Sequence, residues 1–121
     1  YAYNFNVTGK LSISGQNKSG ASEKYVLKEV NMSFTNRDEF SLADLQFNII
    51  AIPDDNGEKI YYQSKDALNL LEPGKSIDRS FRQKEIEFLN NITIVSTLYI
   101  DEGKVNLKNL TTTLTKDDTF S

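Results

Sequence analysis

The sequence contains no cysteine and no histidine. Without cysteine there is no thiolate nucleophile and no disulfide, which excludes the disulfide-stapled scaffolds common among small secreted proteins. Without histidine the chain lacks the usual general base at neutral pH, and both of the commonest zinc ligands are missing together. These absences argue against an enzyme, and we expect no metal and no other cofactor.

The sequence also lacks tryptophan, long apolar runs and any large excess of charges of one sign. No segment approaches the about 18 apolar residues of a transmembrane helix. The net charge is −3, and lysines and arginines are scattered among the acids. This pattern argues against nucleic acid or an anionic membrane surface as the partner. At 121 residues, 38% hydrophobic and 26% charged, residues 1–121 are predicted to form one globular domain.

The segment 30–52 carries the clearest periodicity in the chain. Apolar residues occupy every second position from Val30 to Phe34 and again from Leu45 to Ala51. Alternation of this kind is typical of strands that bury one face. We therefore predict two strands here, joined by a polar turn at 36–39 and ended by Pro53.

Shorter alternating segments fill most of the remaining chain. Gly9 predicts a kink in the first strand, and shifts of phase at Lys28 and after Leu107 predict bulges in two others. The predicted strands cover residues 3–13, 25–34, 42–52, 59–63, 77–81, 86–88, 92–100 and 105–114. Between and after them we predict a loop at 14–22, a helix at 64–71, a type II turn at 72–75 and a frayed tail at 116–121. Roughly seven to nine short strands at this spacing predict an all-β, immunoglobulin-like antiparallel β-sandwich.

Three clusters of charged residues are candidates for chemical sites. The segment 54–58 places oxygen ligands close together, but it lacks the glycine and glutamate spacing of an EF-hand, so we interpret it as a hydrated turn. Asp101–Glu102 is interpreted as a charged turn and not as a glycosidase pair. Arg79, Arg82 and Lys84 alternate with acids, which favours a cross-strand salt network over a phosphate site.

Five N-x-[ST] sequons occur, at Asn6, Asn17, Asn31, Asn91 and Asn109. One interpretation is a β protein rich in asparagine and threonine. The other is an extracellular glycoprotein, because all five sequons fall on predicted turns or on outward strand positions. Glycosylation without cysteine suits an archaeal cell surface better than a eukaryotic one.

A candidate partner surface lies on the outward positions of two predicted strands. Ile50, Ile52, Val95 and Tyr99 alternate with the buried positions of their strands, and those strands are neighbours in an immunoglobulin-like arrangement. Four apolar side chains there would form an exposed patch, which usually marks a protein interface. Asn6 and Asn31 are expected to carry glycans outside the opposite sheet. The alternative is that the turn at 66–71 folds over the patch and buries it.

The last strand offers a second surface. Thr111, Thr113 and Thr115 form an outward row close to the end of the chain. A strand at a sheet edge can pair with another chain. Threonine-rich edges are also ordinary features of β proteins.

Two segments carry a resemblance to known proteins. VNMSFTNRDE and LEPGKSI resemble surface sandwich domains that carry a V-x-[VF]-x-N segment and a later L-x-P-G-[KE]-S turn, which implies a fold and no activity. With its sequons and lack of cysteine, the chain is similar to the soluble domain of archaeal flagellar (archaellum) accessory proteins of the stator type.

That resemblance implies a structural domain outside the cell that anchors the archaellum motor to an S-layer or other cell-surface protein and forms a homodimer. Its membrane attachment would be an N-terminal helix upstream of Tyr1. The alternative function is a ligand- or carbohydrate-binding accessory module, for which only Tyr61, Tyr62 and Tyr99 could stack on a sugar. A late-embryogenesis-type intracellular sandwich is a further rival, which glycans on native material would exclude.

Overall fold

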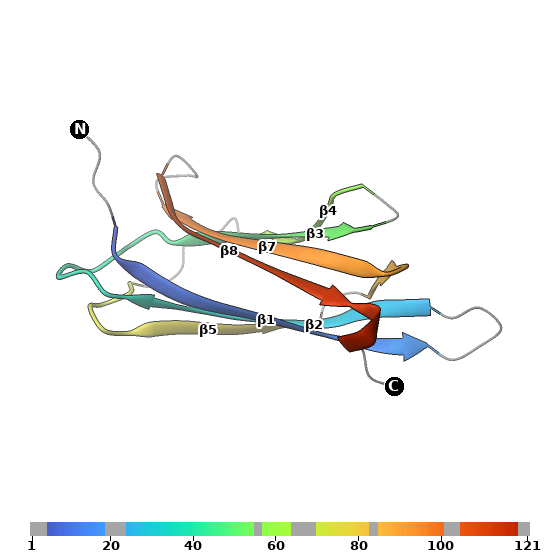
Figure 1. The fold of residues 1–121 in the computed structure, drawn as a ribbon. Helices are drawn as coiled ribbons and strands as arrows, with labels where there is room; N and C mark the ends of the chain where they lie inside the picture. The colour runs from blue at the N-terminus through green and yellow to red at the C-terminus, as the bar shows by residue number, and fades with distance from the viewer. Residues whose placement is uncertain are drawn as a thin grey trace.

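The computed structural model describes residues 5–18, 24–54, 57–63, 70–82, 85–100 and 105–118. Within these ranges the chain forms eight strands and one short 3-10 helix (Figure 1): β1 (Val7–Lys18), β2 (Lys24–Asn36), β3 (Gln46–Pro53), β4 (Lys59–Gln63), β5 (Ser76–Phe81), β6 (Ile86–Phe88), β7 (Asn91–Ile100), β8 (Val105–Thr115) and η1 (Lys116–Asp118). No helix among the described residues has the length and apolarity needed to cross a bilayer.

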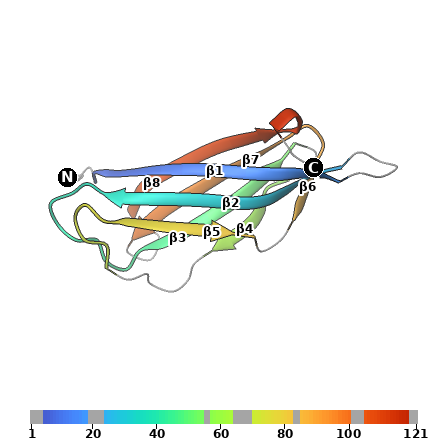
Figure 2. The same ribbon diagram turned by 90° about the horizontal axis from the view of Figure 1, so that it is seen from below.

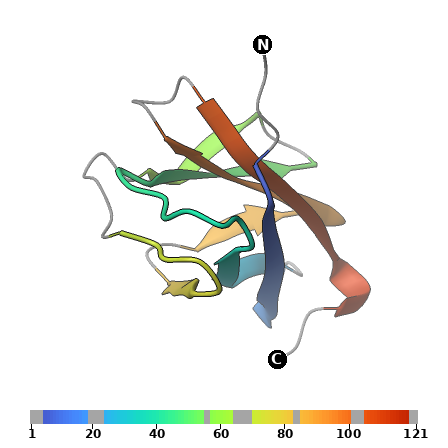
Figure 3. The same cartoon turned by 90° about the vertical axis from the view of Figure 1, so that its left-hand side faces the viewer.

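The strands form two antiparallel four-stranded sheets. One sheet has the order β1-β2-β5, with β6 also paired to β2, and the other has the order β4-β3-β7-β8. The sheets lie face to face as two layers (Figure 1, Figure 3). The predicted all-β antiparallel sandwich is therefore confirmed, with a strand number inside the predicted range.

The core lies between the layers and follows the alternation in the sequence. In β3 and β7 every second residue is buried. The largest fully buried apolar side chains come from both sheets and from the segment before β3: Val26, Leu27, Val30, Phe34, Leu45, Phe47, Ile49, Pro53, Ile92, Ile94 and Leu98. Burial of apolar area of this kind is the main driving force for packing the sheets together.

Both predicted bulges are present. Ser14 pairs with Glu29 and Gly15 pairs with Leu27, so Lys28 is the extra residue of β2. In the same way Leu98 pairs with Lys108 and Tyr99 with Asn106, which leaves Leu107 as the extra residue of β8. Because each bulge adds one residue, the apolar residues occupy even positions on one side of it and odd positions on the other. Both sets therefore face the core.

The predicted kink at Gly9 is wrong. The β1–β2 register runs unbroken from Val7 to Ser14, and Gly9 pairs with Phe34. A Cβ on Gly9 would lie 2.9 Å from Leu110 Cδ1, Phe34 Cδ1 and Ser33 O. The glycine therefore serves close approach between the two sheets and not a bend.

Several predicted boundaries also need correction. The loop expected from residue 14 begins later, because β1 extends to Lys18. Leu42 precedes β3 and forms an isolated bridge with Leu71. The tail expected to fray from residue 116 starts as η1, and the Lys116 N–H donates to Asn90 O. The predicted helix at 64–71 lies outside the described residues over 64–69.

A buried asparagine joins the end of β2 to the segment before β5. Asn36 is fully buried, and its Nδ2 donates to Phe40 O and Leu71 O at 2.9 Å each, while its Oδ1 accepts from the Asp38 N–H at 2.8 Å. The predicted type II turn follows nearby, with Gly74 at a φ of 79° and the Lys75 N–H bonded to Glu72 O. These bonds set where β5 starts along β2.

Candidate functional site

The outer face of the β4-β3-β7-β8 sheet is formed by the strand positions that alternate with the core. β3 and β7 are paired neighbours, as predicted, and Ile50 lies opposite Val95. The outward residues of this sheet are Gln46, Asn48, Ile50, Ile52, Ile60, Gln63, Asn91, Thr93, Val95, Thr97, Tyr99, Asn106, Asn109, Thr111, Thr113 and Thr115. We call this set the neutral face, because none of its side chains is charged although 26% of the chain is charged.

An apolar row crosses three adjacent strands of the neutral face. Val95 on β7 pairs with Ile50 on β3, and Ile50 pairs with Ile60 on β4. Ile60 is 58% exposed, and Ile52 follows Ile50 on the same side of β3. Ile60 was not predicted as part of the patch. The register of β4 is irregular beside it, and Tyr61 and Tyr62 both pack toward the core, so the alternation in the sequence is lost.

Tyr99 does not join this row. It pairs with Gln46, four residues along β7 from Val95, which is about 13 Å at the rise of an extended strand. The structure therefore brings together Ile50, Ile52 and Val95 of the predicted patch and adds Ile60. It places Tyr99 near one end of the same face.

The four predicted patch residues are half-buried. In the turn proposed to cover them, residues 66–69 lie outside the described residues. Leu71 is 3% exposed and pairs with Leu42, whereas Leu70 is 58% exposed. Asn48 lies two residues before Ile50 on the same side of β3, and its Oδ1 is buried without a hydrogen-bonding partner among the described residues.

Two sequons share the neutral face with the apolar row. Asn91 begins β7, and Asn109 pairs with Thr97, two residue pairs along the strands from Val95 and Thr111. The expectation that a sequon lies on the face opposite the apolar patch was made for Asn6 and Asn31. It is correct for Asn31, which lies on the outer face of the other sheet. Asn6 precedes β1 and is exposed, and the side chain of Asn17 lies outside the described part of the chain.

The threonine row lies on an edge strand, as predicted. Thr111, Thr113 and Thr115 point outward from β8, and Thr113 shares a hydroxyl hydrogen bond of 3.0 Å with Thr93. The other side of β8 is close to β1 of the opposite sheet, where Gly9 meets Leu110 (Figure 1). Strand addition at β8 would have to displace this contact.

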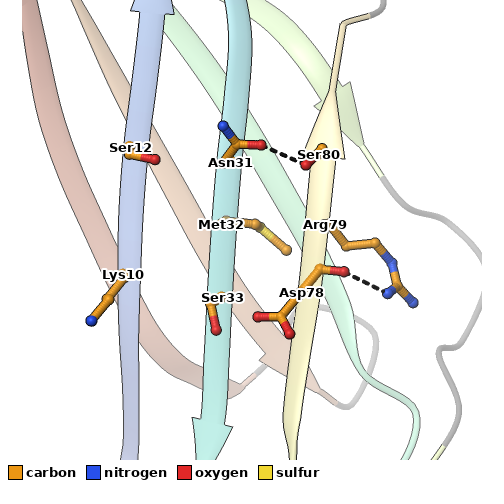
Figure 4. A pocket seen from close by; sticks show the side chains of 8 residues that line it. All are labelled: Lys10, Ser12, Asn31, Met32, Ser33, Asp78, Arg79 and Ser80. Carbon is orange, nitrogen blue, oxygen red and sulfur yellow. Dashed lines mark hydrogen bonds between the residues drawn. The ribbon is translucent and has the colours of Figure 1, made fainter.

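A shallow hollow of about 250 Å³ lies on the outer face of the other sheet. Figure 2 shows this sheet at the front of the molecule, and Figure 4 shows the side chains that line the hollow. Two rows of paired residues cross β1, β2 and β5 there. One row is Ser12, Asn31 and Ser80, and the next is Lys10, Ser33 and Asp78. We call these six residues the serine hollow. Its side chains are hydroxyl, amide, ammonium and carboxylate groups, without an aromatic ring.

Two ion pairs involve residues of β2, the middle strand of the same sheet. Arg82 Nε donates to Glu29 Oε2, and Lys28 Nζ lies 2.6 Å from Glu85 Oε2. Hydrogen bonds from Asn31 and then from Arg82 hold the pKa of Glu29 below its ordinary value. Arg82 was expected to join a cross-strand salt network, and its ion-pair partner is Glu29 of the neighbouring strand β2. Arg79 donates to the carbonyl of Asp78, and Lys84 lies outside the described residues.

Asp54 has a structural role at the end of β3. Its carboxylate accepts the backbone N–H groups of Leu89 at 3.0 Å and Asn90 at 2.9 Å. Burial raises the pKa of Asp54, but the backbone N–H groups of Asn90, Leu89 and Asn91 outweigh this effect, so the pKa lies below its ordinary value. The described residues contain no group of three acidic side chains placed to hold a metal.

Of the three tyrosines proposed for sugar stacking, Tyr61 lies in the core and Tyr62 is half-buried against it. Tyr61 is 3% exposed, and its hydroxyl donates to Phe81 O. Tyr62 stacks on Phe47 at 5.3 Å and packs against Phe81 at 4.4 Å between ring centroids. These rings therefore cannot form an exposed row with Tyr99.

No family model and no curated protein matches the chain. Among solved structures, a Bordetella pertussis protein described as a candidate ApaA protein is similar, with a TM-score of 0.56 and 12% identity over 88% of this chain and 92% of that one. Northeast Structural Genomics Consortium target SoR45 has a TM-score of 0.54 and 13% identity over 89% of this chain and 85% of that one. At such identities these similarities show the fold alone: the chain is an all-β sandwich.

Proposed function

We propose that this domain is a structural binding module that contacts another protein through its neutral face. The observation that carries the proposal is the row of Val95, Ile50 and Ile60 across three strands of a face without charge. Protein interfaces are depleted in charged residues at their centres, because burying a charge costs free energy unless it is paired.

The size of the face is compatible with a modest interface. Four strands about 4.8 Å apart, with about 3.3 Å per residue along the ten residues of β7, span on the order of 600 Å². A standard interface buries about 800 Å² on each partner. Contact through this face alone therefore favours a reversible complex.

The finer form of the proposal concerns location and partner. The resemblance to archaellum accessory domains supports an extracytoplasmic, membrane-anchored module that binds an S-layer or other cell-surface protein and self-associates as a homodimer. If the neutral face binds protein, glycans at Asn91 and Asn109 would obstruct it. We therefore expect these two sequons to be unoccupied in binding-competent protein.

Co-sedimentation with isolated archaeal S-layer sheets, with light scattering of the free domain beside it, tests this proposal. We expect saturable binding or dimer formation by the wild-type chain and at least a tenfold loss for Ile50→Glu, because a charge would be buried in the contact. Ser12→Glu, at an outward position of the other sheet, is the matched control and should bind as wild type. Equal behaviour of all three proteins would reject the neutral face as an interface, as would unfolding of Ile50→Glu.

A further inference from the structure

The serine hollow has an asparagine sequon at its centre. Asn31, Met32 and Ser33 form the sequon on β2, the middle strand of the β1-β2-β5 sheet. Asn31 and Ser33 both point outward, whereas Met32 is buried in the core at 2% exposure (Figure 4). The amide and the hydroxyl that define an acceptor site are therefore on the same open surface.

The amide of Asn31 is held in one orientation. Its Oδ1 accepts from the Ser80 hydroxyl at 2.5 Å, and its Nδ2 donates to Glu29 Oε1 at 2.8 Å. An amide nitrogen carries two hydrogens, and the bond to Glu29 uses one of them. The second hydrogen takes part in neither of these two hydrogen bonds, so Nδ2 keeps one hydrogen to exchange for a sugar.

The residues around Asn31 leave room above it. Its partners across the sheet are Ser12 on β1 and Ser80 on β5, and Ser33 follows it on the same side of β2. These three side chains are small, and the resulting hollow has a volume of about 250 Å³. Long side chains at the same positions would have covered the amide.

Polar groups suited to a sugar surround this space. Lys10 and Asp78 lie on either side of Ser33 in one row, two strand spacings or about 10 Å apart. An ammonium donates to sugar hydroxyls, a carboxylate accepts from them, and serine does both. Because the hollow is open to solvent, it would bind a free sugar only weakly. A sugar linked covalently to Asn31, however, has an effective concentration in about the millimolar range at the hollow.

We propose that Asn31 carries an N-linked glycan whose first sugar sits in the serine hollow against Lys10 and Asp78. In the linking step, Nδ2 bonds to C1 of a lipid-linked oligosaccharide, the C1–O bond to the carrier phosphate breaks, and Nδ2 loses one proton. The phosphate leaves with the electron pair of that bond. This inference is independent of the neutral face, which lies on the other sheet.

Secretion of the full chain from a glycosylating yeast, followed by enzymatic release in ¹⁸O-labelled water and peptide mass analysis, measures occupancy at each sequon. We expect Asn31 to be occupied. Ser33→Ala, which removes this sequon and keeps Asn31, should lower the unfolding temperature of the secreted protein by about 3 °C. Thr111→Ala, which removes the Asn109 sequon, is the matched control and should leave it unchanged.

A second measurement isolates the contact between sugar and hollow. Asp78→Ala and Lys10→Ala should lower the unfolding temperature of glycosylated protein and leave that of bacterially produced, glycan-free protein unchanged. If Ser33→Ala fails to fold, Asn31→Gln replaces it. An unoccupied Asn31 in folded secreted protein would overturn the proposal, and so would equal effects of Asp78→Ala with and without the glycan.

Discussion

At the scale of single residues, Gly9 shows how one atom limits the distance between the sheets. A side chain at this position would meet the backbone carbonyl of Ser33, which cannot rotate away, as well as the side chains of Phe34 and Leu110. Three contacts at 2.9 Å are too short for a Cβ. The glycine therefore allows β1 and β8 to pack closely at this position.

We expect Gly9→Ala to destabilise the domain by about 1–3 kcal/mol, as overpacking does in a close-packed interior. Urea unfolding measures this difference. Gly57→Ala is the matched control, because no atom lies within 4 Å of a Cβ placed there. Equal stability of the two variants would contradict the close approach at Gly9.

Asp54 leads to a prediction for pH. The folded pKa of this carboxyl is lowered, so the ionised form stabilises the fold above the ordinary pKa of 3.8, and this contribution is lost as the pH falls through the folded pKa. The stability difference between wild type and Asp54→Ala should therefore be largest near neutral pH and shrink in acid. Urea unfolding between about pH 2 and pH 7 measures it. A difference that stays constant across this range would reject the role of the backbone N–H groups of Leu89 and Asn90.

At the scale of elements, the strands and both bulges could be predicted from the phase of apolar residues. Lys28 and Leu107 were found because one extra residue moves every later side chain to the other face. The kink at Gly9 was mispredicted because a sequence does not distinguish a glycine needed for bending from one needed for space. The bridge between Leu42 and Leu71 depends on contacts 29 residues apart, which alternation does not encode.

The candidate site was partly predictable for the same reason. Ile50, Ile52 and Val95 follow from strand phase together with the pairing of β3 and β7. Ile60 could not be found, because the irregular pairing of β4 breaks the alternation that would have revealed it. The distance from the apolar row to Tyr99 depends on the register between strands, which no local pattern specifies.

The hydrogen bonds of Asn36 connect the end of β2 with Phe40 and with Leu71, which precedes β5. They lead to a prediction at the scale of elements. Asn36→Ala would remove its hydrogen bonds to Phe40 O, Leu71 O and the Asp38 N–H, and Leu71 O would keep its bond from the Leu42 N–H. We therefore expect a loss of about 2–4 kcal/mol in the free energy of unfolding. Asn48→Ala is the control, because Asn48 Oδ1 is buried without a partner among the described residues. We expect that variant to lose less than about 1 kcal/mol. Similar losses for both, measured by urea unfolding, would show that the Asn36 bonds contribute little.

At the scale of the whole molecule, the two outer faces differ in charge. The β1-β2-β5 sheet carries Lys10, Asp78 and the ion pair of Glu29 with Arg82, and it holds a polar hollow. The neutral face carries no charged side chain and is crossed by an apolar row. We infer a domain that keeps one face hydrated and uses the other for contact.

Labelling of single cysteines tests this account most directly, because the natural chain contains none. Val95→Cys lies at the centre of the neutral face and Ser12→Cys on the opposite sheet. Their reaction rates with a maleimide are compared in dilute protein, in concentrated protein and with S-layer sheets. We predict that Val95→Cys reacts at least tenfold more slowly in concentrated protein or with S-layer sheets than in dilute protein, while Ser12→Cys reacts equally in all three conditions. Unchanged labelling of Val95→Cys in every condition, or equal protection of both positions, would contradict it.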